Sequence, residues 1–498
     1  MYHDAGITGS VQTPGPVVAV EHSFPVGPIA SPALRGARRP GAAPSARPEN
    51  PRSRRGRLIY VSIAGLVVLA LVAATWCVHR RVTDPVLLVY WWIGNGAVLF
   101  WTYAFFKGRR FPHLPMATGR IVAIVVAHEQ DADDLRACIW SILGQRALLV
   151  DEVHVVDDGS VDRPVQPFAH PRVRWHRKKS RGKGAAQVYV LDRLEPGDWD
   201  FVLTVDGGCT LDERAIEHQL RAFSQPQVTA TTGMVIVRNA RQNLLTRIAD
   251  VNIGTSYVKR RVSPSLPGAL KIMSGAPALY RADILFRHKR RYLAAGDHGD
   301  DRFLAMYAAL EGKVVGVDES IGWTRTPADL ESAARQLLRW SRSWWCLIPL
   351  ALTGVNRPPG MLSRLFVLCQ LVVGPLATGY ALIAIAVGAS RGTLPLPTIV
   401  LWAALYLLVR YATTGLYLVE RPETSRRGKL WTWFLLTPAE AAWNLLFVAP
   451  IKYAALLRLG WRGWQGWRDD RRTGLSAAAS AEAGTVYYSG YLLPEHRS

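Results

Sequence analysis

The sequence predicts an α/β domain that is inserted between two groups of membrane-spanning helices. Three observations support this prediction. Short β-branched runs alternate with helical stretches between about residues 112 and 326, and long apolar runs lie on both sides of that segment. Between those apolar runs, four short motifs follow one another, at residues 157–160, 201–206, 299–302 and 336–340. Buried β-branched runs that are separated by helices are typical of a parallel sheet covered on both faces.

The composition agrees with a membrane protein that has basic flanks. Apolar residues make up 49 % of the 498 residues, and the formal charge is +22. Nucleic-acid binding is the alternative reading of this charge, but the arginines cluster beside apolar stretches rather than along a binding module, so we expect no nucleic-acid partner. The five cysteines are scattered without a C-x-x-C pair. They indicate neither a zinc site nor a disulfide framework, and they predict a reducing compartment for the polar part.

The N-terminal part is expected to hold a tail and two spans. Residues 1–50 are rich in Pro, Gly and Ala without an apolar period, which predicts a disordered tail. Residues 51–110 are expected to form two transmembrane helices, at Leu58 to Val78 and at Pro85 to Phe106. Basic clusters precede the first run and follow the second, and the positive-inside tendency places both clusters, with the segment after them, in the cytoplasm.

The C-terminal part returns to apolar runs. The stretch from Leu396 to Val419 is expected to be a span despite Arg410. The stretch from Leu430 to Leu459 contains two prolines and a glutamate, so one span and two short helices both remain open. An odd total would leave the basic end outside, and we therefore favour a hairpin, or an interfacial helix plus a span. The expected divisions are 111–335 for the cytoplasmic α/β domain, 336–360 for interfacial amphipathic helices, 361–468 for C-terminal transmembrane helices, including Leu365 to Val387, and 469–498 for a disordered tail.

Within the α/β domain, two acidic residues fall where predicted strands end. Ligands of parallel sheets bind beyond the C-terminal ends of the strands, which is where Asp157 and Asp206 lie. The predicted strands are Arg120 to Ala127, Glu152 to Val156 and Asp200 to Val205, and the predicted helix is Asp131 to Gly144.

The first motif, and a lysine that follows it along the chain, suit the transfer of a sugar from a nucleotide donor. In that reaction the charge of the leaving diphosphate must be neutralised, and a base must take the proton of the acceptor hydroxyl. The acceptor sugar must also be held with that hydroxyl aimed at the anomeric carbon. Asp157 or Asp158 can accept hydrogen bonds from a base or ribose, and Gly159 permits close approach of the backbone. Lys183 is predicted to begin a helix, where its charge and the helix N-terminus together favour a phosphate. Taken alone, each has an ordinary explanation as a turn, a cap or a solvated loop.

The other motifs supply carboxylates and an aromatic side chain. Asp206 is a suitable ligand for Mg²⁺ or Mn²⁺ together with substrate phosphates. Asp300 and Asp301 are adjacent acids ahead of a predicted helix, and their repulsion raises one pKa and favours a base. The residues of the last motif have i, i+3, i+4 spacing and so share one helix face. Its glutamine can hydrogen-bond to a hydroxyl, its arginine can pair with a diphosphate, and its tryptophan can stack on a sugar ring. Its residues are Gln336, Arg339 and Trp340.

From about Gly119 to Trp345 the chain resembles the processive family 2 glycosyltransferases, most closely the class I hyaluronan synthases. The resemblance includes the string Gly299 to Arg302 and the stretches Asn243 to Arg247 and Ser274 to Arg281. It implies a GT-A type, Rossmann-like nucleotide-sugar transferase domain in a multi-pass protein of the plasma membrane, in contact with membrane lipids. It further implies an inverting enzyme that uses UDP-sugars, with UDP-GlcNAc and UDP-GlcA suspected, to elongate and translocate a β-linked, hyaluronan-like polysaccharide.

The resemblance also implies roles for single residues. By resemblance, Asp157 or Asp158 contacts the uridine, Lys183 contacts the nucleotide, and Asp206 binds the metal-diphosphate. Asp301 is then the general base. Arg339 faces the diphosphate, and Trp340 faces the acceptor. Two positions depart from the family pattern. The second metal-site Asp falls on Gly208, and the aromatic that stacks on uracil falls on His128, whose imidazole can still stack.

Other functions remain open from the sequence. A non-processive transferase that acts on a lipid-linked acceptor would use the same motifs. A degenerate transferase domain that serves as a scaffold is a candidate because Gly208 removes a carboxylate. A membrane channel without synthesis leaves the nucleotide-type fold unexplained.

Overall fold

The computed structural model describes residues 111–146, 149–260, 277–294, 301–353, 396–419 and 424–459, with single residues and short stretches elsewhere between 73 and 421. The expected tails at 1–50 and 469–498 lie outside the described residues. The expected spans from Leu58 to Val78, from Pro85 to Phe106 and from Leu365 to Val387 also lie largely outside them.

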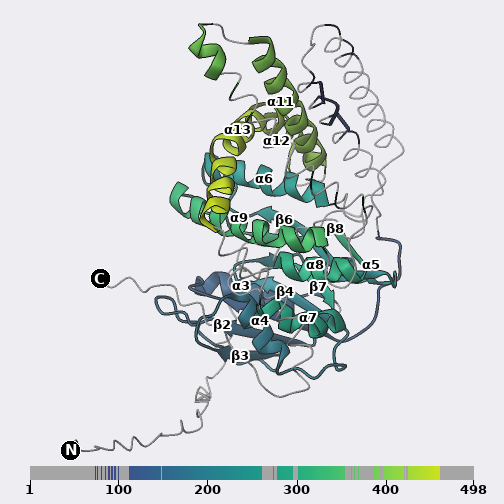
Figure 1. The fold of residues 1–498 in the computed structure, drawn as a ribbon. Coiled ribbons are helices and arrows are strands. Elements are labelled where there is room, and N and C mark those ends of the chain that lie inside the picture. The colour runs from purple at the N-terminus through teal and green to yellow at the C-terminus, as the bar shows by residue number, and fades with distance from the viewer. Residues whose placement is uncertain are drawn as a thin grey trace, which may run out of the picture. The chain divides into compact units, whose positions relative to one another are not determined.

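An eight-stranded sheet forms the centre of the α/β part, in the order β3-β2-β1-β4-β7-β6-β8-β5 (Figure 1). The first four strands in this order are parallel, and β1 lies between β2 and β4. The strands are β1 Ile121–Ala127, β2 Glu152–Asp157, β3 Val173–Arg177, β4 Phe201–Asp206, β5 Thr210–Leu211, β6 Val228–Val237, β7 Ala278–Arg281 and β8 Lys313–Thr324. The three strands expected from the sequence are therefore confirmed to within a residue.

The expected parallel sheet is confirmed for the first four strands of this order and is wrong for the second half. Strand β7 is antiparallel to both of its neighbours, β4 and β6, and β5 is antiparallel to β8, whereas β6 and β8 are parallel. The result is a mixed sheet, which is common among large α/β sheets. Strand β7 has only four residues and runs directly into a helix, so its sequence lacks the β-branched run that would have predicted it.

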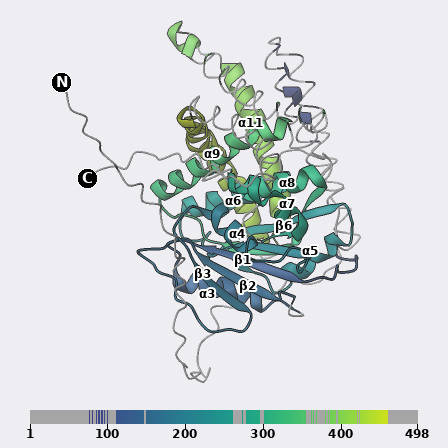
Figure 2. The ribbon, with the colours of Figure 1, turned by 60° about the horizontal axis from the view of Figure 1, so that its bottom comes forward.

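Helices cover both faces of the sheet (Figure 2). Alternation along β1 sends Ile121, Ala123 and Val125 to one face and Val122 and Ile124 to the other. The first face packs on α3 and α5, and the second on α4, α7 and α8. The helices are α3 Ala132–Leu143, α4 Lys183–Leu191, α5 Ala215–Phe223, α6 Leu244–Arg260, α7 Ala282–Ala294, α8 Asp301–Glu311 and α9 Leu330–Thr353.

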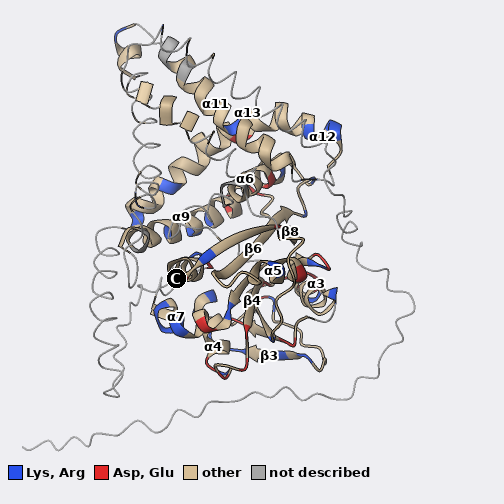
Figure 3. Cartoon of the chain, turned by 90° about the vertical axis from the view of Figure 1, so that its right-hand side faces the viewer, with Lys and Arg blue, Asp and Glu red and all other residues tan. Residues whose placement is uncertain are grey.

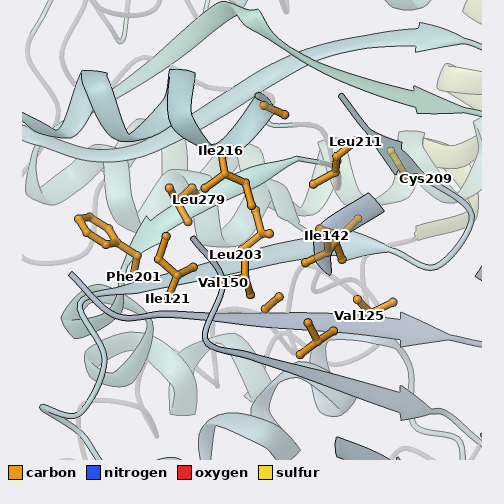
Figure 4. Packing of buried hydrophobic residues seen from close by; sticks show 14 of the residues in the cluster. Ile121, Val125, Ile142, Val150, Phe201, Leu203, Cys209, Leu211, Ile216 and Leu279 are labelled. Carbon is orange, nitrogen blue, oxygen red and sulfur yellow. The ribbon is translucent and has the colours of Figure 1, made fainter. Parts of the chain in front are cut away.

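The core under α3 and α5 fixes the strand ends that carry the polar motifs. Figure 4 shows side chains of this core, including Ile121, Phe201 and Leu203 from neighbouring strands and Ile142 and Ile216 from the covering helices. All five are at most 4 % exposed. Burial of each such side chain stabilises the fold by about 1.5 to 3 kcal/mol, so the strands are held rigidly beneath their C-terminal ends.

Two helices in the described part are long and apolar enough to cross a membrane, by length and composition only. The first is α11 (Leu396–Val419), with the bounds expected from the sequence. The second runs from Arg426 to Leu459. It contains α12 (Arg426–Trp431), η4 (Thr432–Leu436), α13 (Thr437–Trp443) and η5 (Asn444–Val448).

The hairpin that the sequence favoured as one of two arrangements for this region is wrong, because residues 426–459 form one continuous helix, whereas an interfacial helix plus a span stays a prediction. Pro438 is the second residue of α13 and lies two residues after the end of the π-helical segment η4. The wider hydrogen-bonding pattern of a π-segment accommodates a missing backbone N–H without breaking the helix. Helix α9 likewise runs through the expected boundary between residues 335 and 336.

Polar contacts join the apolar helices to each other and to the α/β part. Arg410 of α11 donates from Nε to Oε2 of the fully buried Glu440 of α13, at 2.8 Å. Two residues beyond the C-terminal end of α11, Arg421 binds Asp250 of α6, with Nη1 2.8 Å from Oδ2. Figure 3 shows that α11 is otherwise almost free of charge, whereas charged residues are spread over the α/β part.

Candidate functional site

A cavity of about 850 Å³ lies at the C-terminal ends of the parallel strands. Val126, Asp158 and Asp206 line it where β1, β2 and β4 end. Residues from α6, α8 and α9 form further walls. Trp443 and Val448, from the long C-terminal apolar helix, also line the cavity, so it extends from the sheet to that helix.

The cavity brings together most of the site residues expected from the sequence. Asp157 does not line it, and Asp300 lies outside the described residues. The expected residues that line the cavity are His128, Asp158, Lys183, Asp206, Asp301, Gln336, Arg339 and Trp340.

Lys183 joins the two carboxylates at the centre of the cavity. Its Nζ lies 2.5 Å from Oδ1 of Asp206 and 2.5 Å from Oδ2 of Asp301. Lys183 begins α4, as the sequence predicted, after Gly182 at φ 86°. Burial alone would lower the pKa of Lys183, but the carboxylates of Asp206 and Asp301 outweigh it and raise the pKa above its ordinary value. The ammonium is therefore charged at neutral pH.

Asp301 has one engaged and one open carboxylate oxygen. The residue begins α8 and is 7 % exposed. Oδ2 accepts from Lys183, whereas the buried Oδ1 has no hydrogen-bond partner among the residues that the structure describes. A buried carboxylate oxygen without a partner is costly, and it is relieved when a ligand hydroxyl donates to it.

Asp158 holds the loop that leads to Lys183. Its Oδ1 lies 2.6 Å from Nζ of Lys178, and its Oδ2 accepts from the backbone N–H of Gly182 at 2.9 Å. Gly159 makes this approach possible: it has φ +74°, and a Cβ there would lie 2.8 Å from the backbone nitrogen of Ser180. The close backbone approach expected at Gly159 is thus present, but its partner is the protein's own loop.

Asp157 turns away from the cavity. Its Oδ1 accepts from the backbone N–H of Ser160 at 2.9 Å, and its Oδ2 lies 3.6 Å from Nε of Arg177. The buried carboxylate thus fixes the turn after β2, and Asp158 is the member of the pair that faces the cavity.

Glu129 supports this turn from the neighbouring strand and was missed from the sequence. Its carboxylate accepts from the backbone N–H groups of Val161 (2.5 Å) and Arg163 (2.8 Å), and the first of these bonds lowers the pKa of Glu129 below its ordinary value. The residue has φ 48°, which is uncommon outside glycine. Beside it, His128 Nδ1 lies 3.0 Å from the carbonyl oxygen of Asp158, which fixes the imidazole at the rim of the cavity.

The donor set around Asp206 bears on the expected divalent cation. The Asp206 side chain is 52 % exposed to the cavity, and Gly208 supplies no second carboxylate. A Cβ at Gly208 would lie 3.0 Å from Nε2 of Gln130, so the Gln130 amide takes up that side. Within the described part of the chain, no three His, Cys, Asp or Glu side chains lie close enough together to hold a metal. These residues fit a cation that one carboxylate shares with the phosphates of a nucleotide, and they do not form an all-protein cage.

The expected helix face on α9 is present. Gln336, Arg339 and Trp340 lie on this one helix and line the cavity together. Arg302, at the start of α8, donates from Nη1 to the carbonyl oxygen of Trp340 and so ties α9 to the helix that carries Asp301. This link was also missed, because nothing in the spacing of the two helices along the chain predicts it.

Comparison with known proteins identifies the class. Residues 119–343 match the family model described as glycosyltransferase like family 2. With the relatives below, this match makes the chain a glycosyltransferase. The matched segment, from the approach to β1 into α9, is a family 2 glycosyltransferase domain with the expected GT-A-like α/β fold.

Curated relatives agree with this class. A hyaluronan synthase of Streptococcus pyogenes is 27 % identical over 391 residues, which cover 74 % of this chain and 87 % of the relative. An N-acetylglucosaminyltransferase of Azorhizobium caulinodans is 24 % identical over 360 residues, which cover 70 % and 86 %. A solved structure of a mannosyltransferase from Pyrobaculum calidifontis, in complex with GDP-Man and Mn²⁺, aligns with 77 % of this chain and 98 % of its own at 18 % identity and a TM-score of 0.45.

Proposed function

We propose that the protein is a membrane-integrated, inverting glycosyltransferase that elongates a β-linked polysaccharide from UDP-sugars and passes it across the membrane. The observation that carries the proposal is that Lys183, Asp206, Asp301 and Trp340 line one cavity, which continues to Trp443 of an apolar helix. A transfer site needs the first three groups for chemistry, and a polymerising enzyme needs an exit beside the acceptor.

The proposed reaction assigns each group a task. The acceptor hydroxyl attacks the anomeric carbon from the side opposite the diphosphate, the bond from that carbon to the diphosphate breaks, and UDP leaves. Asp301 accepts the hydroxyl proton at Oδ1, the oxygen that has no partner in the described part. Lys183 and Arg339 face the diphosphate, and Trp340 stacks on the acceptor sugar. His128 stacks on the uracil while Gln336 binds acceptor hydroxyls.

A cation belongs to this proposal at Asp206. When bound, Mg²⁺ or Mn²⁺ supplies positive charge to the leaving diphosphate. Asp206 would hold it together with phosphate oxygens, as the single exposed carboxylate allows.

The substrates and the location are part of the same proposal. The 27 % identity to a hyaluronan synthase supports UDP-GlcNAc and UDP-GlcA as donors. The two long apolar helices support an integral membrane protein. We place it in the plasma membrane with several spans and with residues 111–335 in the cytoplasm, where UDP-sugars are available.

A degenerate scaffold remains the second candidate, since Gly208 lacks the carboxylate that a complete cation site would have. Purified full-length protein, incubated with a panel of labelled UDP-sugars and Mn²⁺, separates the possibilities. We expect long polymer that linkage-specific glycosidases digest. Single additions to a lipid acceptor would indicate a non-processive transferase, and nucleotide binding without turnover would indicate the scaffold.

A further inference from the structure

The position between Asp206 and Asp301 is filled by a group of the protein itself. The Nζ of Lys183 lies 2.5 Å from an oxygen of each carboxylate, so these two oxygens are no more than twice that distance apart. Divalent cations such as Mg²⁺ bind carboxylate oxygens at about 2.0 to 2.1 Å. A divalent cation shared by these two oxygens would need them within about 4.2 Å of each other, and it would lie between them, where the ammonium lies.

An ammonium and a divalent cation exclude one another at this distance. Two positive charges within a few ångströms repel strongly in a site that is partly shielded from water. The Lys183 side chain is 24 % exposed, and its tether to the first turn of α4 keeps it at the site.

The chain offers little to favour the divalent cation over the lysine. Gly208 contributes no carboxylate, and the Gln130 amide beside it carries no charge. Asp158, the other acidic residue nearby at a strand end, is engaged by Lys178 and by the loop before α4. Among the described residues that line the cavity, each carboxylate already pairs with a basic side chain: Asp206 and Asp301 with Lys183, Asp158 with Lys178, and Asp134 with Arg238.

We propose that Lys183 is an internal competitor of the divalent cation, which bars it from Asp206 until a nucleotide diphosphate draws the ammonium away. The phosphates then complete the cation's shell and accept Lys183, and the same movement releases Oδ2 of Asp301. This inference rests on the proposed function, because it takes a nucleotide diphosphate as the donor's leaving group. Its consequence is that cation binding requires nucleotide.

Binding of Mn²⁺ to the purified full-length protein tests this directly. Electron paramagnetic resonance of free Mn²⁺ would be used to measure affinity without nucleotide and with UDP, for the wild type, Lys183→Met and Lys179→Met. Lys179 is an exposed lysine of the same loop and controls for the loss of one charge near the cavity.

Without nucleotide, we expect weak Mn²⁺ binding by the wild type and by Lys179→Met, and affinity higher by about ten-fold or more in Lys183→Met, because a competing charge has been removed. UDP should strengthen binding by the wild type to a similar extent. Equal nucleotide-free affinity in the wild type and Lys183→Met would overturn the inference. If Lys183→Met is not folded by circular dichroism, Lys183→Ala carries the same expectation.

The outcome is separable from that of the proposed function. A wild type that makes no product from any UDP-sugar, yet shows the Lys183-dependent difference in Mn²⁺ binding, would refute the synthase and leave the competition standing. Polymer synthesis with Mn²⁺ binding that is indifferent to Lys183 would refute the competition alone.

Discussion

At the scale of single residues, Asp301 has the clearest expected effect. Asp301→Asn removes the proton acceptor but keeps the size of the side chain, so sugar incorporation should fall by about 10²- to 10⁴-fold. UDP binding, measured by calorimetry, should remain within a few-fold of the wild type, because the diphosphate contacts assigned to Lys183 and Arg339 are kept. Normal polymer yield from this variant would remove Asp301 as the base.

Asp158 is expected to act through the loop that it holds. Asp158→Ala breaks the bonds to Gly182 and Lys178, and it leaves a lysine ammonium that is 12 % exposed without its carboxylate. We expect a loss of about 2 to 4 kcal/mol in stability and weaker UDP binding, since the start of α4 is released.

Asp162 provides the matched control for this prediction. It is exposed in the loop after β2, and Asp162→Ala should change stability by no more than about 0.5 kcal/mol. Thermal unfolding and UDP titration of both variants would check the pair. Equal behaviour of the two variants would mean that the Asp158 contacts do not support the loop.

Residue-level expectations from the sequence succeeded where a strand or helix end fixes the side chain. Asp206 and Lys183 fall at ends that β-branched runs and a helical stretch predict, and both line the cavity. Asp157 was not separable from Asp158, because adjacent residues at a strand end point in opposite directions and the strand end was uncertain by one residue. Glu129 and Gln130 act across the sheet edge, and such contacts leave no pattern along the chain.

At the scale of elements, the contact between α6 and α11 depends on a glycine. A Cβ at Gly254 would lie 2.1 Å from the ring of Tyr417, so Gly254→Ala must separate the two helices. We expect a loss of about 1 to 3 kcal/mol despite the better helix propensity of alanine. The cavity should also change shape, because Asn252 and Ile253 of α6 line it.

Gly415 of α11 serves as the control for this helix contact. Among the described residues, a Cβ there would meet only Nε1 of Trp433, at 3.5 Å, which is an ordinary contact. Gly415→Ala should be neutral or slightly stabilising in thermal unfolding of the detergent-solubilised protein. A lower melting temperature for Gly415→Ala than for Gly254→Ala would contradict this packing.

The strand pair β2 and β3 predicts a pH dependence. Burial lowers the pKa of His154 below its ordinary value and lowers that of His176 to about 4, and the two imidazoles lie 3.0 Å apart, Nδ1 to Nε2. The unfolded chain binds these protons near pH 6.5, so the stability that neutral imidazoles give is complete above that pH and is lost as the pH falls toward 4.

Melting temperatures at pH 7.5, 6 and 5 would check this dependence. The decrease on acidification should be smaller in His176→Phe, which keeps an aromatic ring and removes one titrating group. A decrease of the same size in wild type and variant would assign the acid sensitivity to other groups.

At the scale of the whole molecule, the order of segments could be predicted further than their geometry. The change from apolar runs to alternating strands and helices revealed an α/β domain ahead of apolar helices, because periodicity and length are local properties. The antiparallel β7 and the continuous helix to Leu459 could not be read in this way. Four residues carry too little pattern, and the π-segments that accommodate Pro438 have no sequence signature of their own.

The proposed function requires the nucleotide-sugar donor, the base Asp301 and the acceptor-binding Trp340 to act within one cavity. A cryo-electron microscopy structure of the full-length protein with UDP, Mn²⁺ and a short glycan tests this most directly. We predict phosphate oxygens next to Lys183 and Arg339, Mn²⁺ on Asp206, and the glycan end on Trp340 with a hydroxyl facing Asp301. UDP or glycan density in a different cavity, with Asp301 facing neither ligand, would contradict the account.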